Sequence, residues 1–139
     1  MIRALILSLA LAIAAVLPAT AQEILDPNPQ IEAVIGSQFS AFEAEDVTDA
    51  WQYASPSIQA LFGDPQNFGR MVQQAFPMVW EPSDFEFIDL QTLGSMTVQR
   101  VEVIDQAGNL HYLGYSMIET EAGWRINGVQ VLRAPDLGV

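Results

Sequence analysis

The chain has 139 residues, with 5 Lys and Arg against 17 Asp and Glu, so its formal net charge at pH 7 is −12. So few cations exclude a nucleic-acid binder, which needs basic side chains to displace counterions from phosphates, and they disfavour an anionic membrane surface. Because the chain has no cysteine, neither a disulfide nor a lipid-modified cysteine can form, and one hydrophobic core has to stabilise the fold.

Residues 1–21 have the three parts of a secretory signal peptide. Arg3 gives a positively charged start, residues 4–16 are apolar apart from one serine, and small residues precede Gln22. The apolar run is shorter than the roughly 20 residues that cross a bilayer. We expect cleavage between Ala21 and Gln22, which would leave an exported, soluble protein of the bacterial periplasm with no membrane attachment.

The segment after the signal peptide is predicted to be extended and then helical. Residues 22–28 are expected to form an extended leader, because the prolines around them are incompatible with a helix interior. Asn28 is a favoured helix cap, and Pro29 is a favoured first helical residue. Apolar side chains then recur with helical spacing at Ile31, Val34, Ile35, Phe39 and Phe42. We therefore predict a first helix from Pro29 to about Ala44 with one apolar face.

Three further short helices are predicted before the chain changes character. Their caps are Asp46, Ser55 and Asp64, and the last two caps are each followed by proline. The helix after Asp46 is expected to extend to about position 54. Gly63 ends the third helix, because glycine adopts the left-handed conformation that a helix stop requires. Pro77 stops the fourth helix.

The second half of the chain is typical of β-strands. Four strands are predicted at residues 85–90, 96–104, 110–119 and 124–133, with turn residues between them. Their consecutive order indicates hairpins, and therefore an antiparallel sheet. The alternation of apolar residues slips within 96–104 and again after Gly128, which indicates β-bulges and a strongly bent sheet.

Helices followed by a curved four-stranded antiparallel sheet predict a single α+β domain over residues 29–135, with a short tail at 136–139. This order of elements resembles the nuclear-transport-factor-2-like, or SnoaL-like, cone fold, in which helices close the open end of a curled sheet. The strings AFEAEDVTDAWQYASPSIQALFGDPQNFGRMV, PMVW and GWRINGVQVLRAP are similar to an uncharacterised bacterial family, domain of unknown function 4864. That family supplies no activity, ligand or catalytic residue to carry over.

Three side chains are candidates for a ligand site inside the cone. His111, the only histidine, is predicted to share one strand face with Tyr115, and Asn127 lies in the next strand. Imidazole can act as a general base or contact a ligand, although a partly exposed histidine that hydrogen-bonds a neighbour is the simpler interpretation. The hypothesis is that these side chains form the polar tips of an otherwise apolar cavity.

The densest acidic cluster is not expected to bind a metal. Glu43, Glu45, Asp46 and Asp49 lack the glycine and the ligand spacing of a calcium-binding loop, and acids at a helix start are stabilised by the helix dipole. The sequence also has no G-x-S-x-G elbow and no glycine-rich phosphate loop. We therefore expect neither a metal site nor a cofactor.

These observations leave three classes of function open. The first is non-catalytic binding of a small apolar molecule, or of a partner protein, outside the cytoplasm. The second is a small isomerase, dehydratase or hydrolase that uses His111 or a buried carboxylate inside the cone. The third is an interaction module that forms a homodimer through the outer face of the sheet. An open apolar cavity would favour the first two classes, and a cone packed shut would favour the third.

Overall fold

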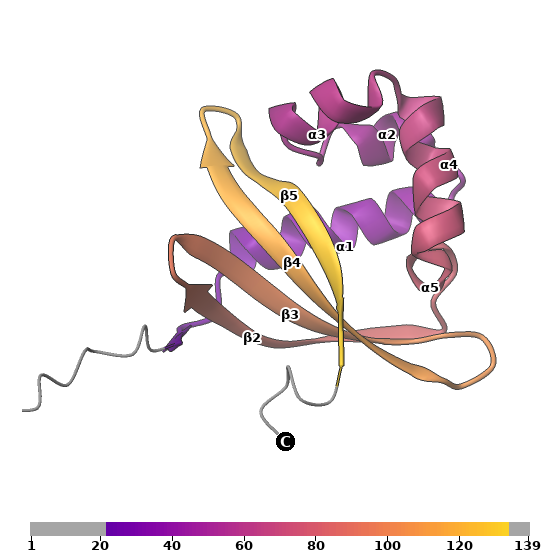
Figure 1. The fold of residues 1–139 in the computed structure, drawn as a ribbon. Helices are drawn as coiled ribbons and strands as arrows, with labels where there is room; N and C mark the ends of the chain where they lie inside the picture. The colour runs from indigo at the N-terminus through magenta and orange to yellow at the C-terminus, as the bar shows by residue number, and fades with distance from the viewer. Residues whose placement is uncertain (1–21, 134–139) are drawn as a thin grey trace, which may run out of the picture.

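Helices cover one face of an antiparallel sheet in the computed structural model, which describes residues 22–133 (Figure 1). In chain order the elements are β1 (Glu23–Leu25), α1 (Pro29–Glu43), α2 (Val47–Trp51), α3 (Pro56–Phe62), α4 (Pro65–Ala75), α5 (Pro77–Trp80), β2 (Asp84–Leu93), β3 (Met96–Ile104), β4 (Leu110–Thr120) and β5 (Gly123–Leu132). The strands lie in the order β1-β2-β3-β4-β5. The predicted α+β class is confirmed. Within these residues no helix is long and apolar enough to span a membrane.

Within residues 22–133 the sheet has five strands, so the prediction of four is wrong. The additional strand, β1, lies inside the predicted extended leader and pairs with the end of β2, with Glu23 opposite Thr92 and Leu25 opposite Leu90. Three residues are too few to show a strand pattern in the sequence. Pairing satisfies the backbone groups of this extended segment, because β2 continues past the predicted end and offers a free edge. The predicted signal peptide and the tail at 136–139 lie outside the described residues.

One of the two predicted bulges is confirmed. Between β4 and β5 the register shifts, and Asn127 is the extra residue between Ile126 and Gly128. The bulge predicted within 96–104 is wrong, because β3 pairs with β4 without interruption. In that strand Met96 and the residues in phase with it face away from the helices. The second register shift lies in β2 instead, between Phe87 and Asp89.

All four predicted helix caps are confirmed. Each cap side chain accepts a hydrogen bond from a backbone N–H of the following turn, at Asn28, Asp46, Ser55 and Asp64. The second helix is shorter than predicted, because Ala54 leaves it and forms a parallel bridge with Ile126 of β5. Pro77 follows the end of α4 as expected, but it also begins the one-turn helix α5, where a proline at the first position is favoured.

The hydrophobic core lies between α1 and the face of the sheet that we call the inner face. The predicted apolar face of α1 supplies Ile31, Ile35, Phe39 and Phe42, and the strands supply Val101, Val103, Leu113 and Tyr115. Phe39 stacks on Phe85 of β2 with 4.5 Å between the ring centroids. The short helices α2 to α5 then close the remaining side of the inner face, and this arrangement positions the candidate site (Figure 1).

Candidate ligand-binding site

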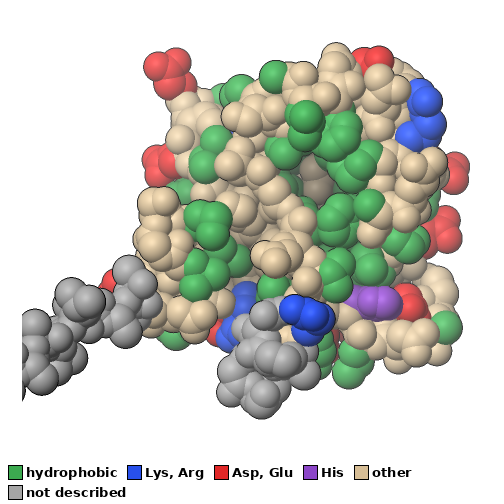
Figure 2. Space-filling view, in the orientation of Figure 1, with side chains coloured by type: hydrophobic (Ala, Val, Ile, Leu, Met, Phe, Trp, Pro, Cys, Tyr) green, Lys and Arg blue, Asp and Glu red, His purple; other side chains and the backbone are tan. Residues whose placement is uncertain are grey.

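An apolar cavity of about 60 Å³ lies between the helices and the inner face of the sheet. Its lining side chains come from α1, α3, α4, α5, β4 and β5, so it forms only when the helices close over the sheet. Half-buried apolar side chains surround its mouth: Ile58, Met71, Phe76 and Val129. Figure 2 shows a hollow among hydrophobic side chains over the region between α4 and β5 in Figure 1.

The helical face of α4 forms one wall of this cavity. Phe68, Met71 and Val72 are spaced three and four residues apart, so their side chains project from one face of the helix. Because α4 ends at Ala75 and Pro77 begins a new helix after Phe76, the chain turns there, and α5 adds Val79 to the same wall. The short helices α4 and α5 therefore place apolar side chains along two sides of a space that one long helix could not enclose.

Tyr115 is a polar tip in this apolar cavity. It lies on the inner face of β4, and only 2 % of its surface is exposed. Within residues 22–133 its hydroxyl makes no hydrogen bond. Every side-chain oxygen or nitrogen in residues 22–133 that is completely enclosed has a hydrogen-bond partner. The unpaired hydroxyl of Tyr115 is therefore not completely enclosed, and because Tyr115 lines the cavity, the hydroxyl opens onto it. Burial raises the pKa of Tyr115 above its usual value, so the hydroxyl stays protonated and can donate a hydrogen bond.

Gln38 is a second polar side chain on the cavity wall, and the sequence analysis did not identify it. It is buried in α1, and its Nε2 donates a hydrogen bond to the carbonyl oxygen of Ala50 at 3.2 Å. That bond fixes the amide group beside the cavity. The sequence carried a signal for it, because Gln38 follows Ile35 by three residues and precedes Phe42 by four. A polar residue on the apolar face of a helix is an informative exception.

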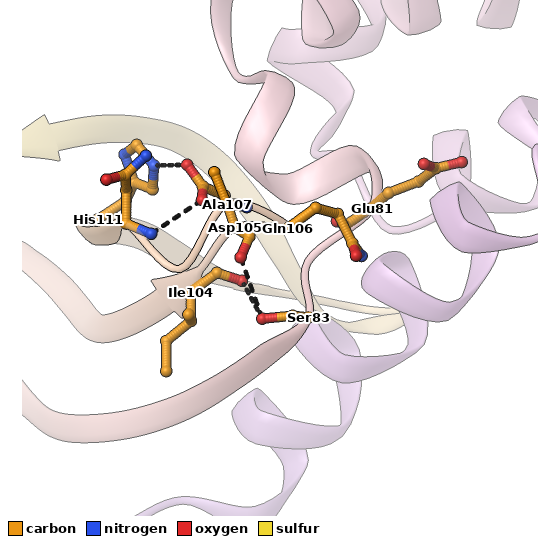
Figure 3. Close-up of polar contacts among 8 residues, drawn as sticks. Glu81, Ser83, Ile104, Asp105, Gln106, Ala107 and His111 are labelled. Carbon is orange, nitrogen blue, oxygen red and sulfur yellow. Dashed lines mark hydrogen bonds and ion pairs between the residues drawn. The ribbon is translucent and has the colours of Figure 1, made fainter.

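His111 lies on the same face of β4 as Tyr115, which is in the middle of the strand, but His111 lies at the start of the strand, beside the turn that follows β3. Its Nε2 lies 2.8 Å from Oδ2 of Asp105 (Figure 3). Asp105 Oδ1 also accepts the backbone N–H groups of Ala107 and Asn109, each at 2.9 Å. These hydrogen bonds, the one to His111 above all, lower the pKa of Asp105 to about 2. The pair therefore orders the turn from residue 105 to residue 109.

The surroundings of His111 favour this structural role. Ser83 donates to the backbone carbonyl oxygens of Ile104 and Asp105, at 3.1 Å each, so its hydroxyl is engaged away from the imidazole (Figure 3). In the part of the chain that the structure describes, no nucleophilic side chain is hydrogen-bonded to His111. Gln106 in the turn also donates to the carbonyl oxygen of Glu81, at 3.1 Å, and so links the turn to the end of α5.

Asn127 joins β5 to α3. Its Oδ1 accepts the hydroxyl of Ser55 at 2.8 Å, and the same fully buried hydroxyl caps α3 by accepting the N–H of Ile58 at 3.2 Å. Asn127 lines a wide depression on the outer face of the sheet, together with Arg100 and other residues. The three predicted side chains thus lie at three separate places. The structure brings Tyr115 together with Gln38, and not with His111 or Asn127.

The acidic cluster after α1 has an ordinary structural role. Asp46 accepts the N–H of Asp49 at 3.0 Å as the cap of α2, and Asp49 in turn accepts the side-chain amide of Gln52. Among residues 22–133, no group of three or more His, Cys, Asp or Glu side chains is arranged to hold a metal ion.

The comparison with protein families gives a match over most of the chain. A family model with the description domain of unknown function (DUF4864) matches residues 25–139, which include every residue of the cavity described above. No curated protein and no solved structure matches the chain.

Proposed function

Because the chain belongs to the family described as domain of unknown function (DUF4864), whose description names no activity, we propose a function from the cavity itself: it binds a small apolar ligand. The observation that carries the proposal is an apolar, open-mouthed cavity with few polar groups on its wall. Sites for small molecules have this form, with apolar walls for affinity and a few placed polar groups for orientation.

The size of the cavity restricts the ligand. At about 60 Å³ it is well below the roughly 300 Å³ at which sites for drug-sized molecules begin. It is also smaller than the cavities of about 150 Å³ that hold benzene. The ligand is therefore slender, with the width of an alkyl chain, or it inserts only one end. Met71 at the mouth has an adaptable side chain that can move to admit it.

The chemistry of the wall supports binding over proton transfer. Among the described residues that line the cavity, Tyr115 is the one with an ionisable side chain, and burial holds it in the neutral form. Acid–base catalysis at neutral pH needs a group whose pKa lies near the working pH. His111, the one imidazole in the sequence, lies outside this cavity.

We also propose a relationship to a known fold and a location outside the cytoplasm. A bent antiparallel sheet with helices across its inner face supports a relationship to the nuclear-transport-factor-2-like cone, with β1 as an added edge strand. The signal-like sequence of residues 1–21 supports binding outside the cytoplasm.

Xenon tests the proposed function, because it is an apolar probe that enters dry cavities. In residues 22–139, xenon pressure is expected to shift the methyl NMR signals of Val72 and Ile126, which line the cavity. Met71→Trp at the mouth is expected to abolish the shifts. Met78→Trp is the matched control, since Met78 is also half-buried but lies outside the cavity. Wild-type methyl signals that do not respond to xenon would contradict the proposal.

A further inference from the structure

We infer that the ligand is a neutral molecule with a hydroxyl or carbonyl oxygen at its inserted end, and that this oxygen accepts a hydrogen bond from Tyr115. The inference rests on the proposed function and adds the chemical class of the ligand and the direction in which it enters.

The hydroxyl of Tyr115 has no hydrogen-bond partner among residues 22–133. Tyr115 is nevertheless only 2 % exposed on the inner face of β4. Because no fully enclosed side-chain oxygen of this region lacks a partner, the hydroxyl is reached from the cavity, where a molecule that enters can bond it. A ligand oxygen in the cavity would complete the hydrogen bond that the fold leaves open.

The position of Tyr115 gives the direction of entry. Tyr115 is 2 % exposed, whereas the side chains at the mouth are only half-buried. Tyr115 therefore lies deeper in the cavity than the side chains at its mouth. The oxygen of the ligand enters first, and its hydrocarbon part extends outwards between Ile58 and Met71. In this orientation a cavity of about 60 Å³ encloses the polar end and the first carbons only, so a longer hydrocarbon is accommodated at the mouth.

The charges around the cavity require a neutral ligand. No side chain that lines it, among the described residues, is a lysine, arginine, histidine, aspartate or glutamate. An ionised group would therefore be buried without a counter-charge, which costs far more than the burial of a neutral hydroxyl. The chain as a whole carries a net charge of −12, which disfavours a carboxylate further.

Gln38 adds selectivity for a hydroxyl. Its Nε2 is engaged with Ala50, while its Oε1 has no hydrogen-bond partner among residues 22–133. Because Gln38 lies on the same wall, its carbonyl oxygen is available to a donor that enters the cavity. A hydroxyl group can accept from Tyr115 and donate at the same time, whereas a carbonyl can only accept.

Binding of 1-butanol and butanoate to residues 22–139, followed through the methyl signals of Val72 and Ile126, tests the inference. The wild type is expected to bind 1-butanol, with a shift of the ring carbon that carries the Tyr115 hydroxyl, and to bind butanoate at least ~100-fold more weakly. Tyr115→Phe is expected to weaken 1-butanol binding by about five- to tenfold, the usual effect of one lost hydrogen bond, while xenon is still expected to enter its cavity. Tyr112→Phe, on the outer face of β4, is the matched control.

The xenon response separates the two proposals. If xenon enters both the wild type and Tyr115→Phe, but the two proteins bind 1-butanol equally, the inference is wrong and the proposed function stands. Butanoate that binds as tightly as 1-butanol would also overturn the inference. A wild type that admits neither xenon nor 1-butanol would overturn both.

Discussion

Gly69 of α4 lies against Val47, the first residue of α2, and a Cβ atom added to Gly69 would stand 2.6 Å from Cγ1 of Val47. Side chains in folded proteins do not approach so closely, so α4 packs on α2 at a distance that requires glycine. The neighbouring Phe68 contacts the ring of Trp51 edge-on, with 5.6 Å between the centroids. The close approach of these two helices therefore helps to position the cavity wall that α4 supplies.

Gly69→Ala is expected to destabilise the fold by about 1–3 kcal/mol, which is typical of overpacking. Alanine is favoured over glycine in a helix by about 1 kcal/mol, but the β-branched side chain of Val47 has few rotamers, and its Cβ would stay 3.3 Å from the added carbon. Urea unfolding measures the difference. Gly36→Ala in α1 is the matched control, because no atom lies within 4 Å of the added carbon there. That variant is expected to gain up to about 1 kcal/mol.

A second substitution tests the cause of this loss. If the contact with Val47 is responsible, Val47→Ala is expected to be less harmful in the Gly69→Ala background than in the wild type, as a double-mutant cycle would show. Additive effects of the two substitutions would show that another contact limits this position.

Because Ser55 bonds Asn127 and caps α3, its substitution by alanine is expected to lower the free energy of unfolding. Ser55→Ala removes the cap of α3 and leaves Oδ1 of Asn127 without its partner, so we expect a loss of about 1–3 kcal/mol. Ser57→Ala, at an exposed position of the same helix, is expected to stay within about 0.5 kcal/mol of the wild type. Equal unfolding free energies for the two variants would contradict the structural role of Ser55.

Asp105 predicts a specific dependence of stability on pH. Its pKa is about 2 in the folded protein, whereas an aspartate in an unfolded chain has a pKa of about 3.9. The unfolded state therefore takes up the proton first as the pH falls. The stabilisation by this carboxylate is complete above about pH 5 and is lost between about pH 4 and pH 2.

Two variants isolate this contribution. The unfolding free energies of Asp105→Asn and the wild type are expected to differ at neutral pH and to converge as the pH falls to about 2. His111→Ala removes the largest cause of the lowered pKa, so the loss of stability is expected to be smaller and to be complete at a higher pH than in the wild type. A difference between Asp105→Asn and the wild type that does not change between pH 5 and pH 2 would refute the assignment.

Local features of the fold could be predicted from the sequence because their signals are local. The cap and proline at Ser55-Pro56 predict the start of α3, and the chain indeed begins a helix there. Gly63, with a φ of 83°, ends that helix as expected. The pairing of β1 with β2 could not be predicted, because it joins two segments that are almost 70 positions apart, and the three-residue strand shows no periodicity.

The candidate site shows the same division between local and tertiary information. Alternation along β4 placed His111 and Tyr115 on one face, which the structure bears out. It could not show that His111 lies against the turn at Asp105, or that the bulge at Asn127 turns that side chain to Ser55. The approach of Gln38 to the same cavity as Tyr115 depends on how α1 crosses the sheet, and that is a property of packing.

A crystal structure of residues 22–139 soaked with 1-butanol would show whether the cavity beside Tyr115 holds a neutral ligand with its oxygen inwards. We expect a butanol chain between Val72 and Ile126, with its oxygen about 2.7–2.8 Å from the Tyr115 hydroxyl. A cavity closed by side chains, or a butanol whose oxygen points out of the mouth, would contradict this expectation.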